Sequence, residues 1–397
     1  MSNRRTFIKQ TGLVSAGTWL VPKFLSGHTK EFNNDLHDNK LVIIQLSGGN
    51  DGLNTVIPFQ NDIYYNNRPQ ISIPKNEVLK LTDEAGFHPV MKHAANLFKS
   101  GDMCIINNVG YPNADRSHFR SMDIWQTASD ANEYWQTGWL GRWLDSSCNS
   151  NKKSGSLIEL DDSLSLAVKG ELTKGLACSN IDKLQKMTAF PFYKQIANQI
   201  PDETPELAYM YKTMLETYQS AEYLQTQIIK SITKENYPAN KFGQSLKTIG
   251  NLISAGIETS VFYTSLTGFD THANQQIRQS KLLQTLDEGI NALISDLKSQ
   301  NQWQNTTLLV FSEFGRRVKE NGSKGTDHGA ANQVFIYSGN LKKQGFYNKL
   351  PSLDTLNDGD IIQEIDFRQI YANILQDWLR CDDTTILQKD FDALSIL

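Results

Sequence analysis

Five short apolar runs divide the chain, and each is followed by a glycine or by a group of polar residues. The runs cover residues 41–46, 103–106, 261–264, 307–311 and 334–337. A continuous apolar run of this length predicts a strand that is buried on both faces, as in a parallel sheet.

Between these runs, apolar residues recur at steps of three and four, the spacing of an amphipathic helix. The clearest helix is predicted for residues 279–299, and residues 206–232, 241–254 and 366–380 show the same pattern. Strands that alternate with helices predict an α/β fold with right-handed crossovers, a largely parallel sheet and helices on both of its faces.

Residues 120–240 contain less strand signal and carry four tryptophans, Trp125, Trp135, Trp139 and Trp143. We interpret this segment as helical insertions that form a cap beside the sheet, within one domain that spans 41–397. Core packing explains the tryptophans better than a sugar-binding platform does, although both interpretations are open at this point.

The N-terminus has the composition of an export signal. Arg4 and Arg5 are followed by a lysine and by an uncharged stretch that is too short to span a bilayer comfortably. This spacing matches a twin-arginine signal over residues 1–27, followed by a polar linker over 28–40, and it predicts a periplasmic or secreted protein. A basic amphipathic helix is the alternative interpretation.

The charge balance argues against one class of partner. The chain has a net charge of −4, and removing the four basic residues of the leader changes it to −8. An acidic body of this kind makes nucleic-acid binding unfavourable. No window of 18 uninterrupted apolar residues is present, so no transmembrane segment is expected in the mature form.

Acidic residues and histidines gather in the loops beside the predicted strands, and three of the seven histidines (His118, His272 and His328) lie there. Ligand sites form at the carboxyl ends of the strands in such sheets. Carboxylates and imidazoles suit one or two divalent ions, Zn, Mn or Mg, or Ca if oxygen ligands dominate. The predicted metal ligands are Asp51, Asp270, His272, Glu313, Asp327 and His328. Turn formation, helix capping and a surface ion pair are the simpler explanations for single members of this set.

Ser117 is the candidate nucleophile, because it lies between Arg116 and His118 and a metal or base could activate its hydroxyl. Arg116 or Arg316 could clamp a tetrahedral anion. The alternative is that Ser117 caps a helix that begins near Phe119.

The same loops resemble a known family. The segments 46–55, 116–119, 269–275, 312–316 and 325–329 resemble those of the bacterial family called domain of unknown function 1501, whose members usually carry a twin-arginine leader. The similarity runs from about residue 40 to the C-terminus. That family is similar in turn to the alkaline phosphatase and sulfatase superfamily, which implies an alkaline-phosphatase-like three-layer sandwich with a metal-bearing sheet.

The resemblance implies that Asp51 and Asp270 match metal-binding acids of the superfamily, and that Ser117 matches its nucleophile. His272 and His328 would match histidine ligands. Glu313 and the phenylalanine after it stand where the superfamily has an Asp-His pair, so one histidine ligand is missing there. The chain also lacks a Cys-x-Pro-x-Arg stretch, which argues against a formylglycine-dependent sulfatase.

Two functions remain open from the sequence. The first is an exported, metal-dependent hydrolase that acts on phosphate or sulfate esters, with an anionic ester or glycan as substrate. The second is a non-catalytic envelope protein that keeps the fold and binds a glycan or another exported protein through residues 120–240. The missing histidine favours the second.

Overall fold

The computed structural model describes residues 39–146, 154–181, 186, 224, 233 and 235–397. The chain divides into two compact units, and the elements described below belong to the unit made of Asp35–Ser179 and Ser231–Leu397. The predicted leader over 1–27 lies outside the described residues, as do the predicted linker over 28–40 except for its last two residues and the predicted helix over 206–232 except for Leu224.

A large sheet forms the centre of this unit, and in the described part of the chain its strand order is β11-β5-β10-β9-β1-β8-β6-β7, with β14 beside β5. Its strands are β1 (Lys40–Ser47), β5 (Met103–Gly110), β6 (Leu157–Glu159), β7 (Leu176–Ala177), β8 (Val261–Thr267), β9 (Thr306–Phe311), β10 (Asn332–Ser338), β11 (Gly345–Phe346) and β14 (Ile365–Asp366). The five strands predicted from the apolar runs are β1, β5, β8, β9 and β10. Almost every residue of these five strands is buried, as expected for a sheet that is covered on both faces.

One strand runs against the others. β10 is antiparallel to both β9 and β5, whereas the other pairings of this sheet are parallel. The beginning of β10 therefore lies at the same edge of the sheet as the ends of its neighbours. As a result, the connection from β9 to β10, residues 312–331, both leaves and returns at that edge.

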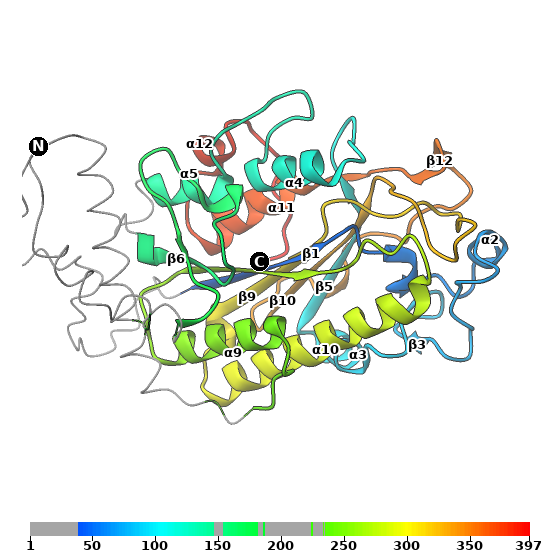
Figure 1. Ribbon diagram of the computed structural model, residues 1–397, viewed down its shortest axis with the longest axis horizontal. Helices are drawn as coiled ribbons and strands as arrows, with labels where there is room; N and C mark the ends of the chain where they lie inside the picture. Colours follow the sequence, from blue (N-terminus) through cyan, green and yellow to red (C-terminus); the bar gives the residue numbers. More distant parts are fainter. Residues whose placement is uncertain (1–38, 147–153, 182–185, 187–223, 225–232, 234) are drawn as a thin grey trace, which may run out of the picture. The chain divides into compact units, whose positions relative to one another are not determined.

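Helices cover the two faces of the sheet and complete a three-layer α/β sandwich (Figure 1). On one side lie α3 (Lys92–Lys99), α9 (Lys241–Ser254) and α10 (Gln275–Ser299), and on the other lie α4 (His118–Thr127), α5 (Trp139–Asp145), α11 (Phe367–Asn373) and α12 (Asp383–Leu387). The predicted fold class is confirmed. Helix α11 continues into one π-helical turn, Ile374–Trp378. The predicted helix over 366–380 is therefore present as an α-helical part followed by a π-helical part.

Smaller elements surround the end of the sheet at which the β9–β10 connection lies. They are an antiparallel sheet of β2 (Val56–Ile57), β3 (Leu79–Lys80) and β4 (Gly86–Phe87), the helix α2 (Asp62–Asn67), and a hairpin of β12 (Leu356–Asn357) and β13 (Asp360–Ile361). No helix of the described residues is long and apolar enough to cross a membrane.

The tryptophans hold the α4 and α5 layer on the sheet. The ring of Trp125 stacks on that of Phe311 with centroids 4.7 Å apart, and Trp139 stacks on Tyr371 at 4.2 Å. Trp143 is also buried in this core. These contacts agree with core packing for three of the four tryptophans, whereas Trp135 is only partly buried and its ring lies 4.9 Å from the guanidinium of Arg142. Of the predicted cap over 120–240, most of residues 180–230 lie outside the described residues.

Candidate metal centre

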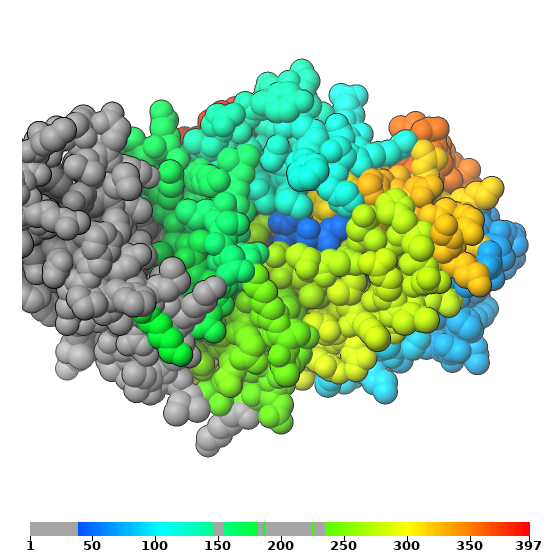
Figure 2. Space-filling model, in the orientation of Figure 1, coloured from blue at the N-terminus to red at the C-terminus, as the bar shows by residue number. Residues whose placement is uncertain are grey.

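The loops after β1 and β8 come into close contact because of a glycine. Gly48 has φ +118°, and a Cβ at this position would lie 2.4 Å from the backbone nitrogen of Asp270. Only a residue without a side chain permits this approach. Figure 2 shows that the surface is hollowed between the α4 segment (teal) and the start of α10 (yellow-green), with atoms of the β1 region (dark blue) at its floor.

Three imidazoles surround one carboxylate oxygen beside this loop. The Nε2 atoms of His272, His328 and His118 lie 3.0, 3.3 and 3.4 Å from Oδ1 of Asp270. Nη2 of Arg316 donates to the same oxygen at 2.7 Å. Among the described residues, His118, Asp270 and His328 form a group whose potential ligand atoms all lie within 4.8 Å of one another. Nε2 of His272 lies only 2.9 Å from Nε2 of His328.

The imidazole of His118 is oriented by a buried carboxylate. Its Nδ1 lies 2.9 Å from Oε1 of Glu313, which also accepts the backbone N–H of Gly48 at 2.8 Å, while Oε2 accepts the hydroxyl of Ser312 at 3.3 Å. The ring of Phe314 packs on the imidazole with centroids 4.8 Å apart. Nε2 of His118 is buried and has no hydrogen-bond partner among the described residues, and it faces Oδ1 of Asp270 at 3.4 Å.

The other two imidazoles are oriented in the same way. Nδ1 of His328 donates to the carbonyl oxygen of Arg116 at 2.7 Å, and Nδ1 of His272 lies 3.3 Å from Oδ1 of Asp327. Since a carbonyl oxygen can only accept, the proton of His328 is on Nδ1 and the lone pair is on Nε2. In metal sites, a histidine typically binds the ion through one nitrogen while an oxygen acceptor holds the other.

The ionisation of Asp270 and His328 agrees with this arrangement. Burial lowers the pKa of His328, assisted by the charge of Arg316. Burial alone would raise the pKa of Asp270, but its contacts, the hydrogen bond from Arg316 foremost, outweigh burial and lower this pKa to about 2. The hydrogen bond to Glu313 raises the pKa of His118. Near neutral pH the centre therefore contains an ionised Asp270 and a neutral His328, the forms that bind metals.

Arg316 joins several loops and has little capacity left for a ligand. Its guanidinium is completely buried and donates to the carbonyl oxygens of Gly49 at 2.6 Å, Thr326 at 2.8 Å and Phe269 at 3.1 Å, in addition to Asp270. The anion clamp predicted for this residue would require donors that are already used here.

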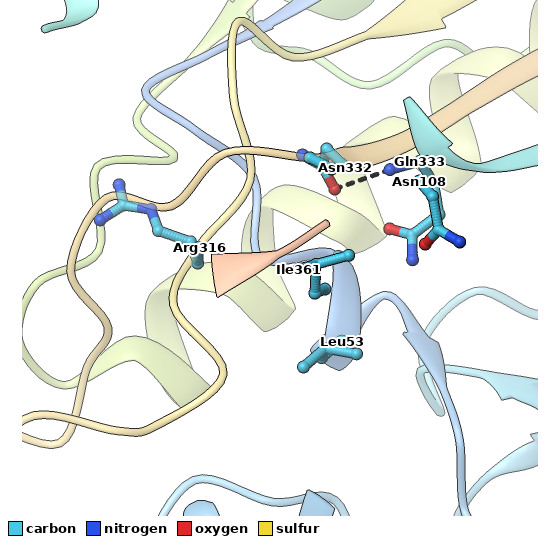
Figure 3. Close-up of a pocket in the computed structure, with 8 residues that line it drawn as sticks. Leu53, Asn108, Arg316, Asn332, Gln333 and Ile361 are labelled. Carbon is cyan, nitrogen blue, oxygen red and sulfur yellow. Dashed lines mark hydrogen bonds between the residues drawn. The ribbon is translucent and has the colours of Figure 1, made fainter. Parts of the chain in front are cut away.

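Arg316 also lines a small cavity of about 10 Å³, which has room for about one water molecule. Figure 3 shows Asn108, Asn332 and Gln333 beside it, and the guanidinium of Arg316 points away from them. None of the three clustered imidazoles lines this cavity.

Asp51, which the sequence also predicted as a ligand, has different contacts. Its Oδ2 accepts from Arg68 at 2.6 Å and from the side-chain amide of Gln275, and both partners of the ion pair are buried. Arg68 also donates to the carbonyl oxygens of Val318 and Arg317. The other carboxylate oxygen of Asp51, Oδ1, is buried without a hydrogen-bond partner among the described residues.

Ser117 occupies the N-cap position of α4, but its hydroxyl does not cap the helix. The carboxylate of Asp115 accepts its backbone N–H at 2.6 Å. Ser117 is exposed, and the residues on both sides of it contact the cluster, Arg116 through its carbonyl oxygen and His118 through its ring. The guanidinium of Arg116 turns to Asp360 at 2.7 Å.

The structure thus brings Asp270, His272, Glu313, Asp327 and His328 together from two loops, the one after β8 and the connection from β9 to β10. It adds His118, which the sequence analysis placed among the loops without choosing it as a ligand. The available signal was its position, since it is one of the three histidines of these loops and follows the candidate nucleophile directly.

Comparisons with known proteins agree with the family resemblance. A family model described as "Protein of unknown function (DUF1501)" matches residues 38–384. No curated protein sequence matches the chain.

Several solved structures are similar to this chain, all at low sequence identity. A protein in the alkaline phosphatase superfamily from Vibrio parahaemolyticus is 9% identical over 98% of this chain and 78% of its own, with a TM-score of 0.40. The sulfatase PsFucS1 from Pseudoalteromonas sp. is 12% identical over 90% and 73%, with a TM-score of 0.39. The C-terminal periplasmic domain of EcEptC from Escherichia coli, in complex with Zn, is 10% identical over 76% and 73%, with a TM-score of 0.37.

Proposed function

The chain belongs to the DUF1501 family, and from its site we propose that it is a metal-dependent hydrolase of phosphate or sulfate esters. One observation carries the proposal. Three imidazoles direct Nε2 to one oxygen of Asp270, while the Nδ1 of each lies beside an oxygen that can accept its proton. Such a convergence of oriented lone pairs is typical of a metal centre and is difficult to explain by packing alone.

The donor set favours particular ions. His118, His328 and Asp270 would hold the ion with His272 beside them, whereas Glu313 and Asp327 would orient imidazoles from behind. Several nitrogens and one carboxylate suit Zn or Mn better than Mg or Ca, which prefer oxygen. The buried Nε2 of His118 fits this assignment, because a bound cation would give a partner to a nitrogen that has no hydrogen bond among the described residues.

The surrounding residues fit ester hydrolysis. A bound metal would polarise the ester and activate the attacking oxygen. Ser117 presents an exposed hydroxyl at the beginning of α4, where backbone N–H groups and the helix dipole favour an anionic group. Its oxygen would bond to phosphorus or sulfur as the alcohol of the ester leaves. Arg116, whose side chain is 38% exposed, adds a positive charge next to Ser117.

Metal analysis tests the proposal most directly. Purified protein that has been incubated with Zn²⁺ or Mn²⁺ and desalted is expected to retain one ion per chain. His328→Ala is expected to lose the ion, whereas His93→Ala, which alters a histidine of α3 outside the centre, is expected to retain it. A panel of phosphate and sulfate esters should be hydrolysed by the loaded wild type and not by Ser117→Ala. A folded protein that retains neither ion and hydrolyses no ester would refute the proposal.

One observation favours the non-catalytic alternative, an envelope protein that binds a glycan or another exported protein. Guanidinium groups already neutralise both Asp270 and Asp51, through Arg316 and Arg68. A chain that had lost its metal during evolution would need such replacement charges. Retention of an ion in the test above, together with hydrolysis, would exclude this alternative.

We further propose that the protein is exported by the twin-arginine pathway and acts in the periplasm or outside the cell. The support is the leader sequence with Arg4 and Arg5. Replacing both arginines by lysine is expected to retain the protein in the cytoplasm, which fractionation would show. Unchanged export would contradict this route.

A further inference from the structure

Two arginines beside the centre share the carboxylates of one hairpin. Oδ2 of Asp358 lies 3.1 Å from Nη2 of Arg116 and 3.4 Å from Nη2 of Arg317. Oδ2 of Asp360 lies 2.7 Å from Nη2 of Arg116, and its Oδ1 lies 3.9 Å from Nε of Arg317. The two guanidiniums therefore contact the same carboxylate oxygen of Asp358.

The arginine pair is fixed to the metal centre through its backbone. The carbonyl oxygen of Arg116 accepts from His328 at 2.7 Å, and the backbone N–H of Arg317 donates to the carbonyl oxygen of Asp327 at 3.0 Å. Residues 116 and 317 thus lie next to cluster residues, and their side chains extend toward the hairpin. Both side chains are about one-third exposed and accessible to a ligand.

The two aspartates differ in how firmly they are held. Asp360 is buried, whereas the side chain of Asp358 is 74% exposed at the tip of the turn between β12 and β13. Asp358 and Gly359 both have positive φ, 52° and 83°, the conformation of a type I′ hairpin turn, for which Asp-Gly is a preferred pair. Since Asp360 balances only one of the two guanidiniums, the second depends on the exposed Asp358.

We propose that Arg116 and Arg317 form a subsite for a second anionic group of the substrate, and that Asp358 occupies this subsite until substrate displaces it. The inference rests on the proposed hydrolase function and defines its substrate class. The substrate is an ester that carries a carboxylate, phosphate or sulfate besides the group that is cleaved. An exposed ion pair is weakened by solvent, so the exchange of Asp358 for a ligand anion costs little.

Binding of three non-hydrolysable probes tests the subsite. The probes are benzylphosphonate and its meta- and para-carboxy derivatives, titrated by calorimetry into protein loaded with Zn²⁺. The better carboxylated probe is expected to bind wild type about tenfold more tightly than benzylphosphonate, because charged hydrogen bonds to two guanidiniums are gained. Asp358→Asn, which keeps a favourable Asn-Gly turn, is expected to increase this ratio of the two affinities, carboxylated probe to benzylphosphonate.

Further variants control for charge and for folding. Arg317→Gln is expected to reduce the ratio to near one, and Arg317→Lys should retain part of it. Asp354→Asn removes the same charge from another exposed position of this segment and is expected to leave the wild-type ratio unchanged. A ratio near one in the wild type and in Asp358→Asn, or no measurable binding of any probe, would overturn the subsite.

Hydrolysis of para-nitrophenyl phosphate and sulfate, measured in parallel, separates the two proposals. Hydrolysis with equal binding of all the probes would refute the subsite and leave the hydrolase standing. The expected binding ratios without hydrolysis of any ester would support the anion subsite and refute the hydrolase.

Discussion

Asp270 and Asp51 both follow central strands of the sheet, yet the structure surrounds them differently. Asp270 is half exposed and lies among three imidazoles and one guanidinium. Asp51 is buried, and the positive group that it contacts is the guanidinium of Arg68. A guanidinium carries a permanent charge and can neutralise a buried carboxylate by itself. Neutral imidazoles cannot, but their lone pairs can bind a cation.

A third carboxylate at this edge shows what happens without either kind of partner. Glu159 is the last residue of β6 and is buried, and its Oε2 accepts the backbone N–H of Ser165 at 2.7 Å. Burial raises its pKa to about 7. Position at the strand ends therefore does not by itself determine the role of an acid, because the neighbouring groups decide between metal binding, an ion pair and protonation.

The largest effect on metal binding and hydrolysis is expected for Asp270→Asn. The variant loses the one carboxylate among the proposed ligands, so metal affinity should fall by at least about a hundredfold and hydrolysis should fall to background. Elemental analysis and ester hydrolysis measure the two effects, with His93→Ala as the control. Full metal content in the variant would show that Asp270 is held only by Arg316.

Asp51→Asn should affect stability instead. It leaves the buried guanidinium of Arg68 without its counter-charge, which costs about 3 kcal/mol of the free energy of unfolding. Urea denaturation measures this cost, and the metal content is expected to stay at the wild-type value. Loss of the ion at unchanged stability would show that Asp51 does not serve mainly as the partner of Arg68. It would support Asp51 as the metal ligand that the sequence predicts.

The pH dependence of stability tests the third carboxylate. Because folding raises the pKa of Glu159, its contribution to stability is complete below about pH 4.5 and is lost as the pH rises through about 7. Glu159→Gln should resemble the wild type at pH 4 and be more stable at pH 8 by an amount on the order of 2 kcal/mol. Parallel stability curves for the two proteins between these pH values would contradict this assignment.

The smallest effect is expected for Glu313→Gln. If Glu313 only orients His118, the variant keeps its ion, and the affinity falls about tenfold, as for other residues that support a metal ligand. Competition with a chelator of known affinity measures the change. Complete loss of metal would instead make Glu313 a ligand itself, the role that the sequence predicts.

The sequence contained enough information for the central strands and for the long helix α10, because continuous apolar runs and the three- to four-residue spacing are local signals. The edge strands β7, β11 and β14 have only two residues each, which is too short for any periodicity. The reversed direction of β10 was not visible either, since a buried strand has the same apolar composition in both orientations.

The site was predictable by location and only partly by role. The loops at the strand ends contained the cluster, but the contact between His118 and Glu313 joins residues 195 positions apart, and that between Arg316 and Asp270 joins residues 46 positions apart. Spacing along the chain cannot show which acid meets an imidazole and which meets an arginine. Arg68, which decides the environment of Asp51, carried no motif that would have identified it.

The place of β1 in the sheet has a consequence for the order of assembly. This strand is near the beginning of the chain, yet it lies between β8 and β9, which are made more than 200 residues later. The N–H of Gly48 that supports Glu313 can therefore find its partner only when synthesis has passed residue 313. A nascent chain, or a fragment that ends before His328, lacks a complete centre, so metal uptake should be a late event in the synthesis and folding of the chain.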